Sequence, residues 1–161
     1  MIIVSDTTSI SNLIQIGQLE LLKQLYQEVI IPKEVYEELL VLTDLGFPIE
    51  DKLRYGWIIT MEVRSHQLIK KFQQELDKGE AGAIALAIEL KADYLLIDEK
   101  VGREVARKNQ IAVVGTIGVL IEGKKTGLVK SIKGKMDELK KIGFWISESL
   151  YNKVIEVEKG M

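Results

Sequence analysis

The chain has 161 residues and a mass of 18.2 kDa, a length that suits one domain with a core large enough to fold without disulfides. Its 47% hydrophobic and 29% charged residues exclude a disordered chain, and no apolar stretch reaches the roughly 20 residues of a membrane-spanning helix. The absence of cysteine excludes thiol nucleophiles and thiolate metal sites, the lone His66 makes histidine chemistry a poor candidate, and the net charge of −2 argues against a broadly basic surface.

Apolar runs alternate with amphipathic segments along the chain, a pattern typical of βαβ units and a parallel sheet. We expect strands over 2–5, 28–31, 57–63, 94–97 and 111–114, with 57–63 at a sheet edge. We expect helices over 9–16, 19–26, 32–42, 66–76, 80–91, 102–109 and 117–124, with Pro32 at a first helical position. The pattern therefore predicts an α/β fold with a central parallel sheet.

The C-terminal part is expected to be helical. Two amphipathic segments, about 131–142 and 147–158, follow Gly127 and are joined through Gly143, Phe144 and Trp145. We predict one domain over 1–161, in which the segments from about 128 to 161 form a packing lid or an interaction arm. Because 1–6 lacks the charged start of a signal peptide, we expect a cytoplasmic protein.

Two of the predicted strands end in acids. Asp6 follows the run 2–4, and Asp98 follows the run 94–97. The carboxyl ends of parallel strands lie at one edge of the sheet, where such folds bind their ligands. Either aspartate alone is equally explained as a turn or N-cap residue.

Two further acids are expected at the same edge. At 100° per residue, Glu80 lies on the helix face of Ile84 and Ala87 that should pack on the sheet. In the helix after Pro32, Glu38 borders the apolar stripe, whereas Glu37 projects away from it. A first-turn acid such as Glu80 is also explained by the helix dipole.

Four acids gathered at one edge would favour a metal site. Two carboxylates ~4 Å apart at an effective dielectric of ~20 repel by about 4 kcal/mol, so such a cluster should hold protons or cations. Oxygen ligands without His or Cys favour Mg²⁺ or Mn²⁺. Both ions are suited to phosphodiester hydrolysis by two-metal-type activation of water. Thr7, Ser9 and Asn12 could orient a water or a phosphate, although capping explains Thr7 or Ser9 equally well.

These motifs together resemble PIN-domain ribonucleases, in particular the toxins of VapBC-type toxin–antitoxin modules. The resemblance rests on segments 4–12, 31–39, 76–88, 95–99 and 113–120 in this order. It implies a Rossmann-like, three-layer α/β/α fold and Mg²⁺- or Mn²⁺-dependent cleavage of single-stranded or structured RNA. The acids of the family fall on Asp6, Glu38, Glu80 and Asp98 as catalytic and metal-binding residues, with Ser9, Asn12 and Thr116 at supporting polar positions.

The chain departs from many members of this family in having Glu80 where they carry aspartate, and in its near-neutral charge. Arg103, Arg107, Lys124 and Lys125 could contact RNA phosphates, although a solvated helix face explains each of them as well. The resemblance also implies an antitoxin partner and a homodimer, with 13–26 and 36–45 as candidate contact surfaces.

Other readings of the first aspartate differ at specific residues. A haloacid-dehalogenase-like phosphatase needs an aspartate where Thr8 stands, a receiver domain needs acids before Asp6, and a dinucleotide-binding domain needs glycines within 5–11. A PIN-like module that binds or regulates without cleaving RNA remains the alternative to a ribonuclease.

Overall fold

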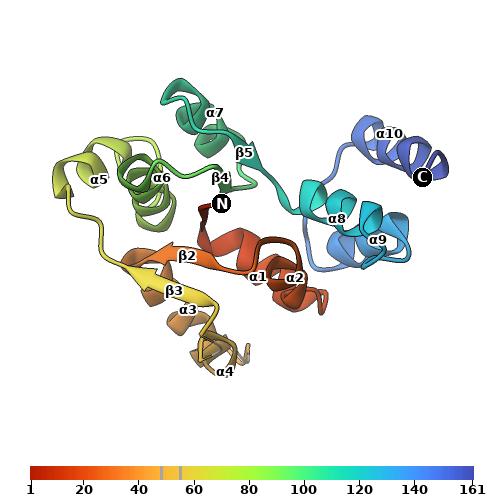
Figure 1. The fold of residues 1–161 in the computed structure, drawn as a ribbon, viewed down its shortest axis with the longest axis horizontal. Coiled ribbons are helices and arrows are strands. Elements are labelled where there is room, and N and C mark those ends of the chain that lie inside the picture. Colours follow the sequence, from red (N-terminus) through yellow and green to blue (C-terminus); the bar gives the residue numbers. More distant parts are fainter. Residues whose placement is uncertain (48, 55) are drawn as a thin grey trace.

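Five parallel strands form the centre of the protein in the order β3-β2-β1-β4-β5 (Figure 1). The computed structural model describes residues 1–47, 49–54 and 56–161. The strands are β1 (Ile3–Ser5), β2 (Val29–Pro32), β3 (Ile58–Met61), β4 (Tyr94–Leu96) and β5 (Val113–Val114). The fold is therefore an α/β fold with a single all-parallel sheet, and its strand 58–61 lies at an edge, as predicted.

The helices lie on both sides of this sheet. In chain order they are α1 (Thr7–Gln15), α2 (Glu20–Tyr26), α3 (Lys33–Asp44), α4 (Ile49–Leu53), α5 (His66–Phe72), α6 (Lys78–Leu90), α7 (Lys100–Lys108), α8 (Thr116–Lys125), α9 (Ile132–Lys141) and α10 (Glu148–Lys159). Helix α6 packs on β1, β2 and β4, whereas α2 and α3 pack on β2, and α3 also packs against α6. The expected three-layer α/β/α arrangement is thus confirmed.

The sheet is held by apolar residues that are buried from both sides. Ile3, Val4, Leu95 and Leu96 are at most 1% exposed, as expected for central strands of a parallel sheet covered by helices. Helix α6 crosses β1, β2 and β4 with its alanine-rich surface, because small side chains allow a helix to approach the sheet closely. This packing fixes the position of the α6 N-terminus relative to the strand ends.

The strand order places a topological switch point at the centre of the sheet. From β1 the chain runs through β2 to β3 on one side, and then returns to β4 and β5 on the other side. The residue before Asp6 pairs with Leu96 in the register Ser5↔Leu96. The segments that follow β1 and β4 therefore leave the same edge side by side, the position at which open α/β sheets bind ligands.

Three details differ from the sequence-based expectation. Helix α4 was not predicted, because a segment of only 5 residues shows no full amphipathic period. Strand β5 covers only Val113–Val114 of the expected 111–114. Pro32 precedes α3 in an extended conformation and is its N-cap rather than its first residue.

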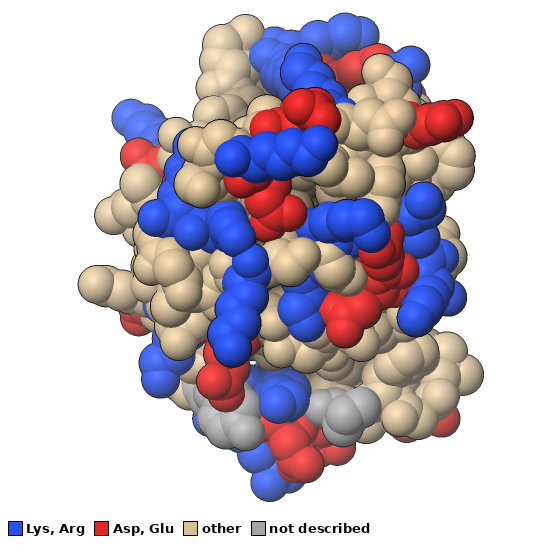
Figure 2. Space-filling view, turned by 90° about the vertical axis from the view of Figure 1, so that its right-hand side faces the viewer, with Lys and Arg blue, Asp and Glu red and all other residues tan. Residues whose placement is uncertain are grey.

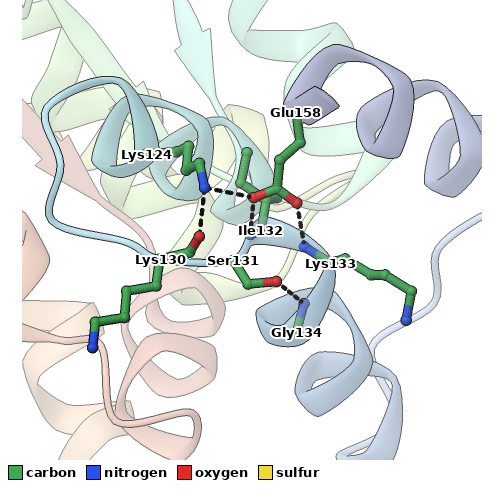
Figure 3. A network of polar contacts seen from close by, with 7 residues as sticks. All are labelled: Lys124, Lys130, Ser131, Ile132, Lys133, Gly134 and Glu158. Atoms are coloured by element: carbon green, nitrogen blue, oxygen red, sulfur yellow. Dashed lines mark hydrogen bonds and ion pairs between the residues drawn. The ribbon is translucent and has the colours of Figure 1, made fainter. Parts of the chain in front are cut away.

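The C-terminal helices are joined to the rest of the fold by a network around Glu158 (Figure 3). The Glu158 carboxylate accepts hydrogen bonds from the backbone N–H of Ile132, at 2.5 Å, and of Lys133, at 3.1 Å. It also forms an ion pair with Lys124 of α8, at 3.4 Å, and Lys124 donates to the Lys130 carbonyl. The end of α10 therefore caps the start of α9 and joins both to α8.

Charges of both signs are interspersed over the face that carries α8 to α10 (Figure 2). Lys135 pairs with Glu138 and Lys133 pairs with Asp137 on this part of the chain. No helix in the described ranges has the length and apolar character needed to cross a membrane.

Candidate functional site at the carboxyl edge of the sheet

Asp6 and Asp98 lie at the switch point, and Ser9 connects them. Asp6 is the N-cap of α1 and accepts from the Ser9 N–H at 3.0 Å, while the Ser9 hydroxyl donates to Asp98 at 3.1 Å. Asp6 is 1% exposed. Burial raises the pKa of Asp6 to about 7, and the nearby charge of Asp98 adds to this effect.

Thr116 at the start of α8 holds the second aspartate in place. Its backbone N–H donates to Asp98 Oδ1 at 2.7 Å, and its hydroxyl donates to Oδ2 at 2.6 Å. With the bond from Ser9, Asp98 accepts three hydrogen bonds, and Ser9 and Thr116 are both buried. The orientation of this carboxylate is therefore set by two helices.

Glu38 reaches the same edge from α3. Its carboxylate accepts from the Thr7 hydroxyl at 2.5 Å and from the Gly79 N–H at 3.1 Å. Thr7 directly follows Asp6, and Gly79 directly precedes Glu80. Glu38 thus connects the start of α1 to the start of α6.

Glu80 lies in the first turn of α6 and is 6% exposed. Burial, together with interactions with Glu99 and Asp77, raises the pKa of Glu80 to about 9. Its Oε2 atom is buried and has no hydrogen-bond partner among the described residues. These surroundings favour the protonated form of the Glu80 carboxyl group.

Asp77 and Glu99 belong to this site, although the sequence analysis did not select them. Asp77 is the N-cap of α6 and accepts from the Glu80 N–H at 2.8 Å, and Glu99 directly follows Asp98. Both are exposed, and a pattern of acids on apolar faces therefore does not identify them. Their direct adjacency to a helix start and to a strand-end aspartate was the available signal. We call Asp6, Glu38, Asp77, Glu80, Asp98 and Glu99 the acidic edge.

Three glycines make room for the carboxylates of the acidic edge. A Cβ atom at Gly79 would lie 2.1 Å from Glu38 Oε1, and one at Gly102 would lie 3.0 Å from Glu80 Oε2. A Cβ at Gly115 would lie 2.9 Å from Asp98 Oδ1. Side chains at these positions would displace the acids or be displaced by them.

Helix N-termini, rather than basic side chains, supply the positive potential at this edge. Asp6 and Asp77 cap α1 and α6, Glu38 accepts from the α6 backbone, and Asp98 accepts from the first N–H of α8. Backbone N–H groups and the helix dipole stabilise carboxylates in this way. Among the described residues, no lysine or arginine forms a salt bridge with any member of the acidic edge.

The donor set of this edge fits a hard divalent cation in its chemistry. It consists of carboxylate oxygens without an ion-pair partner, one of them buried and unbonded on Glu80, and Mg²⁺ and Mn²⁺ prefer such oxygen ligands. The side chains are not gathered for coordination as they stand: within 1–47, 49–54 and 56–161, no three acidic or histidine side chains form a group that could hold a metal ion.

The other residues selected from the sequence lie at different distances from this edge. Asn12 is 8% exposed, and its Nδ2 has no partner among the described residues. Arg103 and Arg107 line a hollow that also includes Asp98. Lys124 lies two helical turns along α8 from Thr116, roughly 12 Å away. It forms an ion pair with Glu158, and Lys125 forms one with Glu122. His66 is the first residue of α5.

The fold and this acidic edge define an α/β protein of the nuclease type, with carboxylates at the switch point of a parallel sheet. The chain belongs to the PIN domain family, whose model matches residues 2–159. Comparisons with curated proteins and with solved structures gave no match. PIN domains are typically nucleases and generally use divalent metals, which is consistent with the oxygen donors of the acidic edge.

Proposed function

We propose that this protein is a Mg²⁺- or Mn²⁺-dependent endoribonuclease that hydrolyses RNA phosphodiester bonds at the acidic edge. The observation that carries the proposal is the burial of Asp6 beside Asp98, where no basic side chain in the described part of the chain forms an ion pair with either. Uncompensated buried carboxylates are costly, and a site that binds cations gives them a function.

In this proposal Asp6, Glu38, Glu80 and Asp98 bind the metal, with Asp77 and Glu99 beside them. Divalent cations held by these residues would supply activation of an attacking water and stabilisation of the leaving oxygen, the chemistry of the two-metal-type scheme. Ser9 and Thr116 orient Asp98, and Thr7 orients Glu38. Because metal ligands must be deprotonated, cation binding would favour the ionised forms of Glu80 and Asp6.

A toxin role is a further part of the proposal and rests on the resemblance to VapBC-type toxins. It includes an antitoxin protein that covers the acidic edge, a homodimer that uses the surfaces of 13–26 or 36–45, and a cytoplasmic location. Exposed Val41 and Leu45 in the second surface support such a contact.

The test is cleavage of labelled RNA by pure protein with Mg²⁺ or Mn²⁺, compared with EDTA. We expect metal-dependent cleavage by the wild type, and a loss of more than roughly tenfold to hundredfold in Glu38→Gln and Asp6→Asn. Glu37→Gln is the matched control, because Glu37 is the exposed neighbour of Glu38 and pairs only with Lys33 and Lys78. Cleavage that survives in Asp6→Asn would come from a contaminating nuclease and would remove the support for the proposal.

A PIN-like module that binds without cleaving is the second candidate. The observation in its favour is that no three acids in the described part of the chain are arranged to hold a metal ion. A folded protein that binds RNA and leaves it intact with either metal would select this candidate.

A further inference from the structure

A wide groove runs along the free edge of β5 and opens beside Asp98. It has a volume of about 1190 Å³, above the range of about 300–1,000 Å³ that is usual for small-ligand pockets. Its walls are mostly apolar, with Val113 and Val114 of β5, Ile117 and Ile121 of α8, and Leu150 and Val154 of α10. They also include the acids Asp98, Glu99 and Glu122. We call this feature the β5 groove.

Four aromatic side chains also line the β5 groove: Tyr26, Tyr94, Phe144 and Trp145. Trp145 is 82% exposed, and Tyr94 is 37% exposed. Trp57, the other tryptophan, is 7% exposed and belongs to the core. An aromatic ring with so much exposed surface contributes little to folding, and flat exposed rings beside a groove are suited to stacking.

A smaller hollow, lined by both basic and acidic side chains, adjoins the groove at Asp98. It has a volume of about 300 Å³ and is lined by Asp98, Lys100, Arg103, Glu104 and Arg107. Lys100, Arg103 and Arg107 follow the i, i+3, i+7 spacing of one helix face. Asp98, Lys100 and Arg103 line both the hollow and the β5 groove, so the two are continuous.

The three cations of this α7 face are not committed to other side chains. Within the described ranges, Lys100, Arg103 and Arg107 form no salt bridge. Lys124 and Lys125, by contrast, are paired with Glu158 and Glu122. The cations near Asp98 are therefore available to an anionic ligand.

We propose that the β5 groove binds the unpaired bases of a single-stranded RNA, while the α7 cations contact its phosphates. The inference rests on the proposed nuclease function and adds a base-binding site to it. The ligand must present negative charge on one side and flat apolar rings on the other, and unpaired nucleotides have both. Aromatic platforms combined with cations along the backbone are the general means of binding single strands.

Two other occupants fit the observations less well. An apolar protein surface, such as a second copy of this chain, would fill the groove but leave the three α7 cations without a partner. A duplex would contact the cations but keep its bases stacked inside, so that Trp145 and Tyr94 would remain exposed. An unpaired strand engages both parts of the surface.

The test is binding of a fluorescently labelled single-stranded oligoadenylate in EDTA, where no cleavage occurs, measured by the anisotropy of the label. The tryptophan fluorescence of the wild type is a second readout. We expect the signal of exposed Trp145 to be quenched, and Trp145→Ala to bind roughly tenfold or more weakly. Trp145→Phe should retain most of the affinity, because it keeps a ring for stacking. Leu45→Ala is the control, since Leu45 is 70% exposed but does not line the groove. The same oligonucleotide annealed to its complement should bind more weakly than the single strand.

Equal binding by the wild type and Trp145→Ala, or equal binding of single strand and duplex, would overturn the inference. Light scattering tests whether a second copy of this chain fills the groove. A dimer that Trp145→Ala converts into a monomer would show that it does and would overturn the inference. If Asp6→Asn abolishes cleavage while Trp145→Ala binds and cleaves as the wild type does, the nuclease function stands and the base-binding site is wrong. Binding that quenches the fluorescence of Trp145, without any cleavage of RNA in the presence of metal, would instead overturn the nuclease function alone.

Discussion

A negative charge on Asp6 is unfavourable mainly because the group is buried, and neighbouring charges add to this effect. Asp98 and Asp77 both raise its pKa, and only the hydrogen bonds from Ser9 lower it. A carboxyl group whose pKa is higher in the folded than in the unfolded chain stabilises the fold fully below the unfolded pKa, and this stability is lost as the pH rises through the folded pKa. The window for Asp6 therefore runs from about 4 to about 7.

The metal-free Asp6→Asn variant should be more stable than the wild type at pH 8. Each pKa unit corresponds to about 1.4 kcal/mol, so the shift from 3.8 to about 7 sets a gain of at most about 4 kcal/mol. Asparagine keeps an oxygen that can cap α1, and it adds no charge. The measurement is urea unfolding in EDTA at pH 8 and pH 4; at pH 4 the gain should largely disappear.

The matched control is Asp51→Asn, because Asp51 is exposed in α4 and should change stability by little at either pH. A variant Asp6→Asn that is less stable than the wild type at both pH values would show that burial of Asp6 is not unfavourable.

Sequence reasoning at this scale found acids that follow a strong pattern. Asp6 and Asp98 end apolar strands, and Glu80 interrupts an apolar helix face, so each was selected from periodicity; their role as ligands stays a prediction. Asp77 is exposed and is the N-cap of α6, so its contact with Glu80 is local and follows from the sequence. Its proximity to Asp6 depends on how α6 packs across the sheet, and the sequence alone does not show it.

At the scale of elements, the Glu158 network explains how two peripheral helices are held. The pKa of Glu158 is lowered: burial acts to raise it, but the N–H groups of Ile132 and Lys133 and the charge of Lys124 together outweigh burial. Because its pKa is depressed in the folded chain, Glu158 contributes stability above its unfolded pKa, and this contribution is lost as the pH falls through the folded pKa.

Glu158→Gln should loosen the contact of α10 with α9 and α8 (Figure 3). Hydrogen bonds to charged groups contribute about 1.5–3 kcal/mol each, so we expect a loss of about 1–3 kcal/mol after partial compensation by the amide. Hydrogen exchange at Ile132 and Lys133 should become faster, since their N–H groups lose a charged acceptor. Glu156→Gln is the control, because Glu156 is exposed and pairs only with Lys159. Unchanged exchange at both amides in Glu158→Gln would contradict this account of the contact.

The sequence indicated α9 and α10 but not their packing. Their amphipathic periods were clear, and Met136 and Leu139 are fully buried. The sequence could not show that α10 packs against α9 and α8. This packing depends on contacts between Glu158 and residues 25 and more positions away. The two-residue β5 was predicted too long for a similar reason, since only Val113 and Val114 find partners on β4.

At the scale of the whole molecule, an acidic chain with a net charge of −2 must still attract an anionic substrate. Charges of both signs are interspersed on the face over α8 to α10 (Figure 2), so long-range attraction by that face is weak. Cations bound at the acidic edge would make this edge positive, and the α7 cations lie next to it. Substrate binding and metal binding should therefore depend on one another.

Metal binding should also stabilise the entire fold, because a ligand that binds only the folded chain adds RT ln(1 + [L]/Kd) to its stability. Mn²⁺ at about 100 times its Kd would add roughly 2.7 kcal/mol, and a domain of this size should gain roughly 5–10 °C in Tm. We expect a clearly smaller rise in Asp98→Asn, measured by differential scanning calorimetry at pH 8. Asp51→Asn, whose carboxylate lies in α4 away from the acidic edge, should respond as the wild type does. Equal rises of Tm in the wild type and Asp98→Asn would show that Asp98 is not a ligand. No rise in either protein would contradict the nuclease proposal, because the carboxylates of Asp6 and Glu80 would then lack the cation that the proposal assigns to them.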